Sequence, residues 1–526
     1  MYIKSPFENK SEIIEYKQDV MILLHGISAG SSAMMKLLLA LFLAGCAGVG
    51  EELPETVAME DPTVVAEWIW TDGQMAWGGW GEQLLALAQR EDRPILIYLA
   101  APGCEGLFPA PTSGLNQLIA ENFVSVRVDP FKRPDIARYY DSGGWPALLA
   151  ALPDGRVFAR AVDIPPANVE PYLRRLYLAY EEKRGIIVDK VRRVGGEREA
   201  QASFEVAAVY RACVAAYDST YGGFGGPSKF LETSVLRFLL AYADEHDEQS
   251  ARQMALHSLD AILDSPLYAK GAFYAYSATP DWNAPVREID ALDQAAMLHL
   301  LLEAGQPRYL GAARELLGFI EGEFFAVDEG FFRGRRIDAE QQWTDPTFYA
   351  DRQAALIRAC LAASTVLEDD RAKRLALQAG DALLAHCIDD NGGVRHVCGA
   401  QHTDVSGLLV DQALAALALW ELGQVSGEVR FADAVDRVAR YMEDRLGGPV
   451  AFYNRAEPVG PLPRFFSHRD TGRPAGNALA LSFYGRRGDI ERSSTLAGGL
   501  RIVPDRAYGS WARAVLRYGG MEKSSL

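Results

Sequence analysis

Aspartate and histidine residues lie near the expected helix starts and glycine turns in the second half of the chain. Cleavage of a glycosidic bond needs two carboxyl groups, one protonated and one ionised, and histidine can serve instead as a proton shuttle. A catalytic group needs to occur only once, so residues outside any repeat are the stronger candidates. These candidates are His402, Asp404, His468 and Asp470.

A second set of aspartates belongs to a repeated motif. Its copies are Leu292-Asp293-Gln294-Ala295, Ala350-Asp351-Arg352-Gln353-Ala354 and Val410-Asp411-Gln412-Ala413. An aspartate before an apolar helical run is typically an N-cap, which accepts hydrogen bonds from free backbone amides. The recurrence favours this structural role for Asp293, Asp351 and Asp411, and a role in lining a funnel stays open. Asp290 and Asp345 occupy similar positions.

Glycine turns divide the same region into helical hairpins. Segments such as Gly222-Gly223-Phe224 and Gly330-Phe331-Phe332 recur at intervals of roughly 50 to 60 residues, the length of two helices with their turns. Apolar periodicity predicts about eleven helices from Glu199 to Tyr518, close to the roughly twelve of an (α/α)6 toroid. Phe224 and Tyr276 could stack on sugar rings at the funnel, or could fill gaps between helices.

The first half of the chain carries an incomplete redox motif. Dithiol chemistry needs two cysteines separated by two residues at a helix start, where the first attacks and the second resolves the mixed disulfide. Cys104 matches the first position, but Leu107 occupies the second. Dithiol turnover is therefore not expected, and Cys104 is either a single reactive thiol or, as the sequence favours, an inert remnant.

The elements around Cys104 follow the order of an α/β fold. Ile95–Ala100 and Phe123–Asp129 are expected strands, and Gly143-Gly144-Trp145-Pro146 precedes a third. This order resembles a thioredoxin fold, in which the proline equivalent to Pro146 is typically cis.

Three motifs carry a closer resemblance: Glu121–Asp129, Arg133-Pro134-Asp135-Ile136 and Gly143-Gly144-Trp145-Pro146. In these the chain resembles the spermatogenesis-associated protein 20-like family, and Tyr221–Gly226 with Lys229-Phe230 is similar to a later motif of that family. The resemblance extends from about Trp68 to Trp511. It implies an α/β thioredoxin-like domain followed by an all-α (α/α)6 toroid of the six-hairpin glycosidase-like type.

The N-terminal segment has the features of a secretory signal. Lys36 precedes an apolar run, Leu37 to Ala44, that ends in Leu43-Ala44-Gly45-Cys46. This ending resembles a bacterial lipoprotein signal with Cys46 as the lipidated residue; a buried helix with an inert cysteine is the alternative. A secretory n-region is short and basic, so residues 1–33 are interpreted as an over-extended start. The expected location is the periplasm-facing side of the outer membrane, with the lipid as anchor.

Composition excludes several classes of partner and cofactor. The 526 residues carry a formal net charge of −17 and no basic cluster, which argues against nucleic acid. No metal-ligand spacing and no phosphate-binding glycine loop occur, so neither a metal nor another cofactor is expected. Cys387 and Cys398 flank a turn-rich segment, and the sequence leaves their pairing open.

The expected organisation is a signal region at 1–46, a tether at 47–65, a thioredoxin-like domain at 66–182 and a toroid at 183–526. Three functions follow from this organisation. The main hypothesis is carbohydrate binding or processing in the toroid, with glycosidase-like or epimerase-like chemistry if the protein is an enzyme. The alternatives are a thiol-dependent protein that acts through Cys104 and a non-catalytic assembly factor with an unknown protein partner.

Overall fold

The computed structural model describes residues 3–4, 70–72, 75–101, 113–140, 144–162, 164–194, 204–337, 343–399, 405–458, 462–470, 473–498 and 505–519. The signal segment with Cys46, the redox positions Cys104 and Leu107, the catalytic candidates His402 and Asp404, and Gly143 all lie outside these ranges. Within the ranges, no helix combines the length and the apolar character that crossing a membrane requires.

The first domain is built on a four-stranded sheet with the order β5-β4-β7-β8. β4 (Ile95–Leu99) pairs in parallel with β5 (Val124–Val128) and antiparallel with β7 (Ala147–Ala151), which pairs with β8 (Val157–Val162). All five residues of β4 are buried, as its continuous apolar sequence predicts for a central strand. A parallel bridge between Gly78 and Val126 adds the chain after β3 to the free edge of β5.

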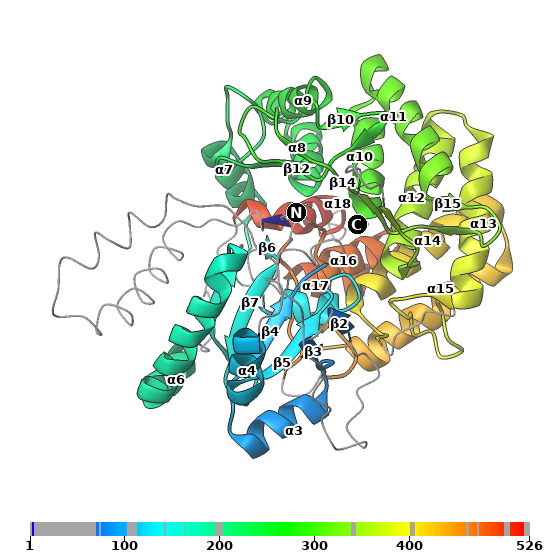
Figure 1. The fold of residues 1–526 in the computed structure, drawn as a ribbon. Helices are drawn as coiled ribbons and strands as arrows, with labels where there is room; N and C mark the ends of the chain where they lie inside the picture. Colours follow the sequence, from blue (N-terminus) through cyan, green and yellow to red (C-terminus); the bar gives the residue numbers. More distant parts are fainter. Residues whose placement is uncertain are drawn as a thin grey trace. The chain divides into compact units, whose positions relative to one another are not determined.

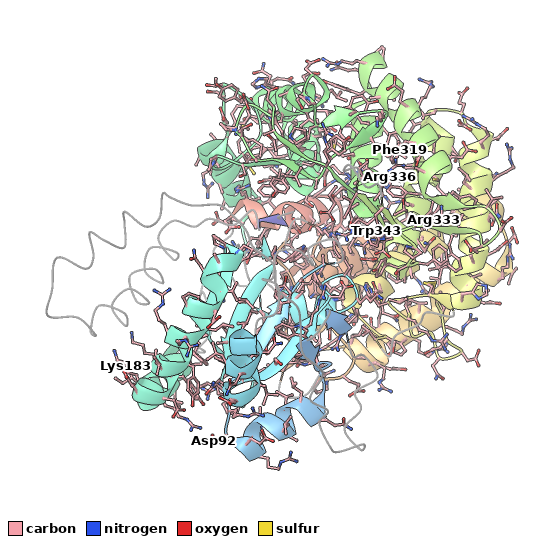
Figure 2. All side chains as sticks on the ribbon, viewed as in Figure 1. Asp92, Lys183, Phe319, Arg333, Arg336 and Trp343 are labelled. Carbon is pink, nitrogen blue, oxygen red and sulfur yellow. A yellow bond between two sulfur atoms is a disulfide. The ribbon has the colours of Figure 1, made fainter. Side chains whose placement is uncertain are left out.

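Helices connect and flank these strands (Figure 1). They are α3 (Glu82–Glu91), α4 (Ser113–Asn122), α5 (Pro134–Tyr140) and α6 (Pro166–Val194), and the short strands are β1 (Ile3–Lys4), β2 (Trp70–Asp72), β3 (Met75–Trp77) and β6 (Gly144–Trp145). The long α6 is kinked at Lys183, which Figure 2 labels and whose φ of −126° is not helical. The peptide bond between Trp145 and Pro146 is cis, the form that the thioredoxin resemblance implies.

The second domain is a closed ring of helical hairpins (Figure 1). Its inner helices are α8 (Thr233–His246), α10 (Ala291–Ala304), α12 (Ala350–Val366), α14 (Leu409–Ser426), α16 (Gly476–Arg487) and α18 (Gly509–Tyr518). Each inner helix contacts the next, and α18 contacts α8, so that the ring closes. The outer helices are α7 (Val206–Ala216), α9 (Gln249–Leu263), α11 (Pro307–Phe319), α13 (Asp370–His386), α15 (Val429–Tyr441) and α17 (Ile490–Gly498). The described residues thus form an (α/α)6 toroid of twelve helices, one more than the approximate count from the sequence.

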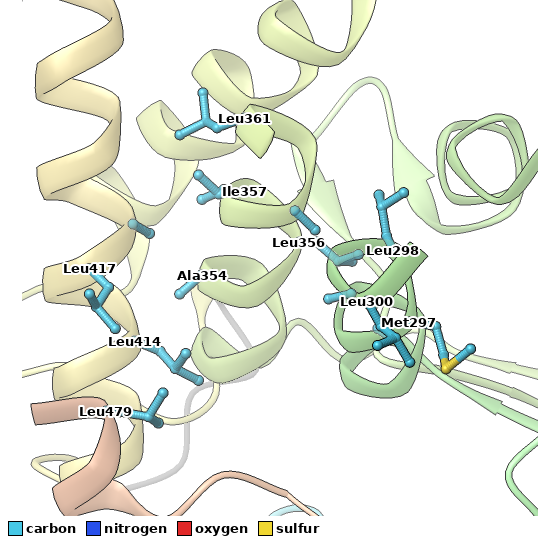
Figure 3. Close-up of a cluster of buried hydrophobic side chains, with 14 of the residues drawn as sticks. Met297, Leu298, Leu300, Ala354, Leu356, Ile357, Leu361, Leu414, Leu417 and Leu479 are labelled. Carbon is cyan, nitrogen blue, oxygen red and sulfur yellow. The ribbon is translucent and has the colours of Figure 1, made fainter. Parts of the chain in front are cut away.

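Burial on every side distinguishes the inner helices from the outer ones. In α14, nearly every residue from Leu409 to Leu419 is buried, because the helix packs against its outer partner and against both neighbours in the ring. Figure 3 shows apolar side chains of successive inner helices facing one another, among them Leu298 of α10, Ile357 of α12 and Leu417 of α14. This core fixes the positions of the inner helix starts.

Short strands and turns lie between the helices. Two three-stranded sheets are formed by β9 (Lys229–Phe230), β12 (Tyr276–Ser277) and β13 (Pro285–Val286), and by β14 (Glu288–Asp290), β17 (Arg335–Ile337) and β18 (Trp343–Asp345). Two hairpins pair β10 (Tyr268–Ala269) with β11 (Ala272–Phe273) and β15 (Phe325–Ala326) with β16 (Phe331–Phe332). π-Helical turns cover Ile320–Phe324 and Met442–Leu446, and a 3-10 turn covers Arg506–Tyr508.

The glutamine of the repeated motif clamps the glycine turn of its own hairpin. The Gln294 side chain accepts a hydrogen bond from the Phe273 N–H and donates one to the Phe273 carbonyl, both at 2.9 Å. The same clamp recurs as Gln353 on Phe332, Gln412 on Val394 and Gly392, and Asn477 on Phe452. The glycine turns and the Asp-Gln-Ala motifs that recur in the sequence are therefore in contact with each other in these hairpins.

The repeated aspartates are not helix N-caps, so the capping interpretation is wrong for them. The N-cap residues of α10, α12 and α14 are Asp290, Tyr349 and Leu408, and the Asp290 side chain accepts a hydrogen bond from the Leu292 N–H at 2.8 Å. Asp293, Asp351 and Asp411 lie in the first helical turn instead.

Candidate functional site

A cavity of about 180 Å³ lies where the inner helices begin, and we call it the mouth cavity. The toroid contributes the first-turn residues Asp293, Asp351 and Asp411 together with Arg352 and Arg473. The thioredoxin-like domain contributes Phe131, Arg138 and Trp145, so that both domains enclose the cavity. Because helix N-termini carry partial positive charge, carboxylates in the first turns are favourably placed.

Phe131 anchors the thioredoxin-like domain in a cage of arginines. The guanidinium carbons of Arg335, Arg352 and Arg473 lie 4.5, 5.2 and 5.8 Å from the centre of its ring. Cations over an aromatic face are attracted by the negative charge of that face. The Phe131 ring is buried and also meets Trp145 edge-on, next to the cis peptide.

His396 links the two domains by hydrogen bonds from both ring nitrogens. Nδ1 lies 2.9 Å from an Asp411 carboxylate oxygen, and Nε2 lies 2.7 Å from the Phe131 carbonyl oxygen. Both partners are acceptors, so the ring is best satisfied as an imidazolium with two donors. Although burial opposes the charge, Asp411 and Asp351 raise the pKa of His396 to about 9.

The Arg133-Pro134-Asp135 motif forms a second contact between the domains. Arg133 donates two hydrogen bonds to the Asp135 carboxylate, at 3.0 and 2.9 Å, and Arg455 of the toroid donates a third at 3.3 Å. Arg455 also donates to the Leu462 carbonyl oxygen at 2.6 Å. These two arginines hold the pKa of Asp135 below its ordinary value despite burial. The motif therefore positions the thioredoxin-like domain on the toroid.

Arg352 organises the carboxylates on one side of the mouth cavity. It donates to Asp290 at 2.9 Å and to Asp351 at 3.0 Å, and Arg473 donates to the same oxygen of Asp290 at 2.8 Å. Burial raises the pKa values of both aspartates, but the guanidinium charges outweigh it and hold them below their ordinary value. Asp290 and Asp351 are therefore ionised and fixed in ion pairs.

Asp293 differs from these neighbours. It lines the mouth cavity and forms no hydrogen bond or ion pair with another described residue. Burial and the negative charge of Asp290 raise its pKa to about 7. A carboxyl group that is half protonated at neutral pH can both donate and accept a proton, which general acid–base catalysis requires.

Two stacked aromatic rings form another wall of the mouth cavity. Phe230 and Tyr276 pair across β9 and β12 with ring centres 4.9 Å apart. The neighbouring Lys229 is buried and donates to Asp218 at 2.8 Å, which fixes the strand. Gly223 in the same motif has a φ of +72°, and a Cβ there would lie 2.7 Å from the Trp282 ring. The motif thus holds Phe230 against Tyr276.

Among the sequence candidates that the structure describes, His468, Asp470 and Phe224 lie outside the mouth cavity. Both carboxylate oxygens of Asp470 accept hydrogen bonds from Ser510, and Oδ1 also accepts one from the Ala475 N–H, so this residue ties the chain before α16 to the start of α18. Burial lowers the pKa of His468 to about 4, and its neutral ring meets the Trp511 ring edge-on. Phe224 is buried in the toroid core.

The pairing that the sequence left open is resolved as a disulfide between Cys387 and Cys398, with Cα atoms 4.7 Å apart. It closes the loop that carries His396. Cys213 and Cys360 are buried free thiols, and burial raises the pKa of both.

Asp351, His396 and Asp411 approach closely enough for one ligand atom of each to surround a metal ion. However, both nitrogens of His396 are engaged with oxygen acceptors. A histidine ligates a metal through a nitrogen lone pair, which a protonated nitrogen lacks. The present geometry therefore favours a proton-bearing network at these residues.

Sequence reasoning missed His396, Phe131, Arg138 and Arg352. A signal for Arg352 was present, because Gln294, Gln353 and Gln412 recur at a spacing of 59 residues and the residue before each is Asp, Arg and Asp. Arg352 thus replaces the acid of its repeat. No comparable signal marks Phe131 and Arg138, because their contacts arise only when the two domains meet.

Comparisons with known proteins agree with this architecture. Residues 70–194 match the family model Thioredox_DsbH, described as "Protein of unknown function, DUF255". Spermatogenesis-associated protein 20 from Homo sapiens is 25% identical over 305 residues, which cover 50% of this chain and 39% of the human protein. The match therefore spans less than half of that relative. It confirms the resemblance predicted from the motifs.

Solved structures resemble the toroid. A cellobiose 2-epimerase from Bacillus thermoamylovorans matches with a TM-score of 0.50 and 13% identity, over 60% of this chain and 96% of that one. A family 76 mannosidase from Bacteroides thetaiotaomicron matches with a TM-score of 0.45 and 11% identity, over 61% of this chain and 98% of that one. The epimerase match shows that the two proteins share the toroid fold.

Proposed function

We propose that this chain, a relative of the spermatogenesis-associated protein 20-like family, binds a small carbohydrate in the mouth cavity and exchanges a proton with it through Asp293. The observation that carries the proposal is a carboxyl group with a pKa of about 7 that faces an enclosed cavity beside fixed arginine–aspartate pairs. Perturbed carboxyl groups in cavities are typical of functional sites.

The size of the mouth cavity suits a single sugar unit. One water-sized group needs about 10 to 15 Å³ on this scale, so about 180 Å³ accommodates on the order of a dozen such groups. A hexose has about twelve non-hydrogen atoms and about the volume of six liquid water molecules, so a single sugar ring fits a cavity of this size. The stacked Phe230 and Tyr276 offer an apolar surface to a sugar ring, and the charged wall offers hydrogen bonds to its hydroxyl groups.

Proton transfer at Asp293 would be supported by the charges around it. The Asp293 carboxylate removes a proton from a carbon next to the carbonyl group of the open-chain sugar, the electron pair moves onto the carbonyl oxygen, and the protonated carboxyl then returns a proton to the same carbon. Arg473 is ion-paired to Asp290 and lines the same cavity, so its positive charge stabilises negative charge that develops on the ligand. Phe131, Arg138 and Trp145 of the thioredoxin-like domain line the same cavity, which reduces the exposure of the site to bulk water.

We further propose that the protein works in the bacterial envelope, anchored to the outer membrane through lipidated Cys46. The disulfide between Cys387 and Cys398 supports this location, because such bonds form and persist in oxidising compartments. The anchor itself rests on the Leu43-Ala44-Gly45-Cys46 sequence.

Ligand-induced thermal stabilisation of the full chain tests the carbohydrate proposal. A panel of neutral and anionic monosaccharides and disaccharides, with cellobiose included, should contain at least one sugar that raises the melting temperature. Tyr276→Leu should weaken that binding at least fivefold, whereas Tyr221→Leu, a change of an exposed tyrosine, should leave it unchanged. A folded protein that responds to no sugar in the panel would overturn the proposal.

Proton exchange is tested separately, by NMR of the bound sugar in deuterated water. The wild-type chain should introduce deuterium into the sugar or convert it, and Asp293→Asn should abolish both while the sugar still binds. The control is Asp328→Asn, which removes an exposed carboxylate. Equal conversion by wild type and Asp293→Asn would exclude Asp293 as the proton-transfer group.

Cell fractionation with lipid labelling tests the location. Cys46→Ala should lose the label and leave the membrane fraction, whereas Cys360→Ala, a change of a buried thiol, should keep both. Equal labelling of the wild type and Cys46→Ala would overturn the anchor.

A further inference from the structure

A second cavity of about 110 Å³ continues from the mouth cavity into the ring of inner helices, and we call it the channel. The two cavities share Arg138, Thr233, Asp293, Val410 and Arg473 as lining residues. Beyond this junction the channel follows the inner helices for several turns, past His299 of α10, Arg358 of α12 and Arg486 of α16.

The wall of the channel carries more positive than negative charge. Two carboxylates, those of Glu303 and Glu421, form ion pairs with four guanidinium groups there. Glu303 accepts from Arg237 at 3.0 and 2.7 Å and from Arg513 at 2.6 Å. Glu421 likewise pairs with Arg358 and Arg486, at 3.0 and 3.1 Å.

The neighbouring His299 adds no compensating charge. Burial and the surrounding guanidinium groups hold the pKa of His299 well below its ordinary value, so the ring is neutral. The same causes, burial and the charge of Arg237, hold the pKa of Arg513 far below its usual range. Both shifts have the direction that an excess of buried positive charge produces.

Arg138 lies at the junction of the two cavities and forms no ion pair with a described carboxylate. It reaches the toroid from α5 of the thioredoxin-like domain, and no described residue forms a hydrogen bond or an ion pair with it. Burial and the charge of Arg473 lower the pKa of Arg138 more than the charges of Asp351, Asp411 and Asp470 raise it. A guanidinium in a cavity without a partner is costly, and an anionic ligand group would remove that cost.

The position of Arg138 also sets what kind of ligand it can receive. It stands on the border between the mouth cavity, which has room for a sugar ring, and the positively charged channel. The chain as a whole carries a charge of −17, so this internal positive region is a local exception. An anionic group at the junction lies beside Arg138 and Arg473, and beside Asp293, which is partly protonated at neutral pH.

We propose that the site binds an anionic sugar, whose carboxylate or phosphate group lies between Arg138 and Arg473 at the junction of the mouth cavity and the channel. This inference rests on the proposed carbohydrate function and specifies its ligand class. A planar guanidinium fork matches both oxyanions, so the two groups share one chemistry and are separated by experiment.

Calorimetric titration of the full chain with D-glucuronate, glucose 6-phosphate and glucose tests the proposal, with inorganic phosphate as a fourth probe. Wild type should bind one of the two anionic sugars at least tenfold more tightly than glucose. Arg138→Gln should reduce that preference below threefold, and Arg138→Lys should keep part of it. The matched control is Arg90→Gln, which removes a largely exposed guanidinium and should behave as wild type.

Each outcome separates the inference from the function on which it rests. Glucose binding without an anionic preference, or a preference that survives Arg138→Gln, overturns the anion site and leaves carbohydrate binding intact. Inorganic phosphate that binds wild type but not Arg138→Gln, while no sugar binds, supports the anion site and removes the carbohydrate function. Absence of binding by all four probes overturns the anion site, and the sugar panel described above then decides the carbohydrate function. Circular dichroism of each variant establishes that it is folded.

Discussion

Asp293 and Arg352 occupy equivalent positions in the helical repeat, one residue before the clamping glutamine, and their electrostatic roles are opposite. Arg352 lies between Asp290 and Asp351 and keeps both ionised. Asp293 has no such partner, and the charge of Asp290 beside it discourages ionisation. The arginine at position 352, where another copy of the repeat has Asp293, thus fixes Asp290 and Asp351 as anions. Asp293 has no such partner and can exchange its proton.

Asp293→Asn should change the pH dependence of stability. The pKa of Asp293 rises from about 3.8 to about 7 on folding, so between these values the folded protein keeps a proton that the unfolded chain has lost. Stability of the wild type relative to Asp293→Asn should therefore fall by on the order of 2 kcal/mol as pH rises from 4 to 7, half of the full shift because cavity water screens the charge. Urea unfolding at pH 4.5 and 7.5 measures this difference.

The same unfolding series with Asp328→Asn provides the control, because that carboxylate is exposed. A pH-independent difference between wild type and Asp293→Asn would contradict the raised pKa.

At the scale of single residues, the sequence identifies the aspartates of the site but does not show which of them are ionised. Asp293, Asp351 and Asp411 could be picked out as one set from their shared motif. Their different charges depend on Arg352, Arg473 and His396, which reach them from other helices and loops. His468 and Asp470 are candidates in the sequence because they do not repeat. Their burial outside the mouth cavity depends on tertiary packing, which a local sequence pattern does not predict.

At the scale of elements, four of the toroid's hairpins are each closed by one side-chain amide, from Gln294, Gln353, Gln412 or Asn477. Gln353 satisfies both the N–H and the carbonyl of Phe332, two buried backbone groups of the hairpin that β15 and β16 form. The clamp fixes each turn relative to the start of the next inner helix. The Asp-Gln-Ala motif therefore needs its glutamine for the fold, whatever residue precedes it.

Gln353→Leu should lower the free energy of unfolding by about 3 kcal/mol, because two buried backbone groups lose their partner. Equilibrium urea unfolding measures the loss. Gln378→Leu is the comparison, since Gln378 is exposed and makes a single bond to the Val327 carbonyl; it should cost less than about 0.5 kcal/mol. Equal losses in the two variants would contradict the clamp.

The disulfide closes another turn, the one that carries His396. Replacing both cysteines, as Cys387→Ala with Cys398→Ala, should lower stability by about 3 kcal/mol, because the unfolded chain regains the entropy of an open loop. Thermal unfolding of the oxidised wild type against the double variant measures the effect. Addition of reductant should shift the wild type toward the variant and leave the variant itself unchanged; an identical response of both would contradict the bond.

The helical hairpins could be predicted from the sequence because their motifs repeat. Glycine turns and Asp-Gln-Ala motifs alternate at a helical-hairpin spacing, and the inner helices are apolar enough to be recognised as buried. The hydrogen bonds between the glutamine and the glycine turn could not be predicted, since a glutamine in a helix is ordinarily expected at the surface. Only the arrangement in space shows that its amide points back to the turn.

At the scale of the whole molecule, the thioredoxin-like domain places its cis-proline face against the toroid. Trp145, next to the cis bond, and Phe131 both line the mouth cavity. The described part of this face is engaged by arginines of the toroid, three of which lie over the Phe131 ring. No pattern within either domain could predict the contact.

The charge of His396 is the part of this interface that pH can alter. The groups that face it are Asp411 from α14, Asp351 from α12, the Tyr349 ring and the Phe131 carbonyl. Its pKa rises on folding from about 6.5 to about 9. Folding therefore gains stability from the imidazolium below pH 6.5, and that gain is lost as pH rises through 9.

His396→Asn should remove this dependence, since asparagine fills part of the space without a charge. We expect the wild type to exceed His396→Asn in stability by about 3 kcal/mol more at pH 6 than at pH 9.5, measured by urea unfolding. His246→Asn, a change of an exposed histidine, should show no such difference. Hydrogen exchange at α5 and β6 supplies the readout of the interface: their amides should exchange faster in His396→Asn, while those of the inner helix α14 away from the mouth keep their protection. Uniform loss of protection throughout the chain would instead mean that His396 supports the toroid alone and does not join the two domains.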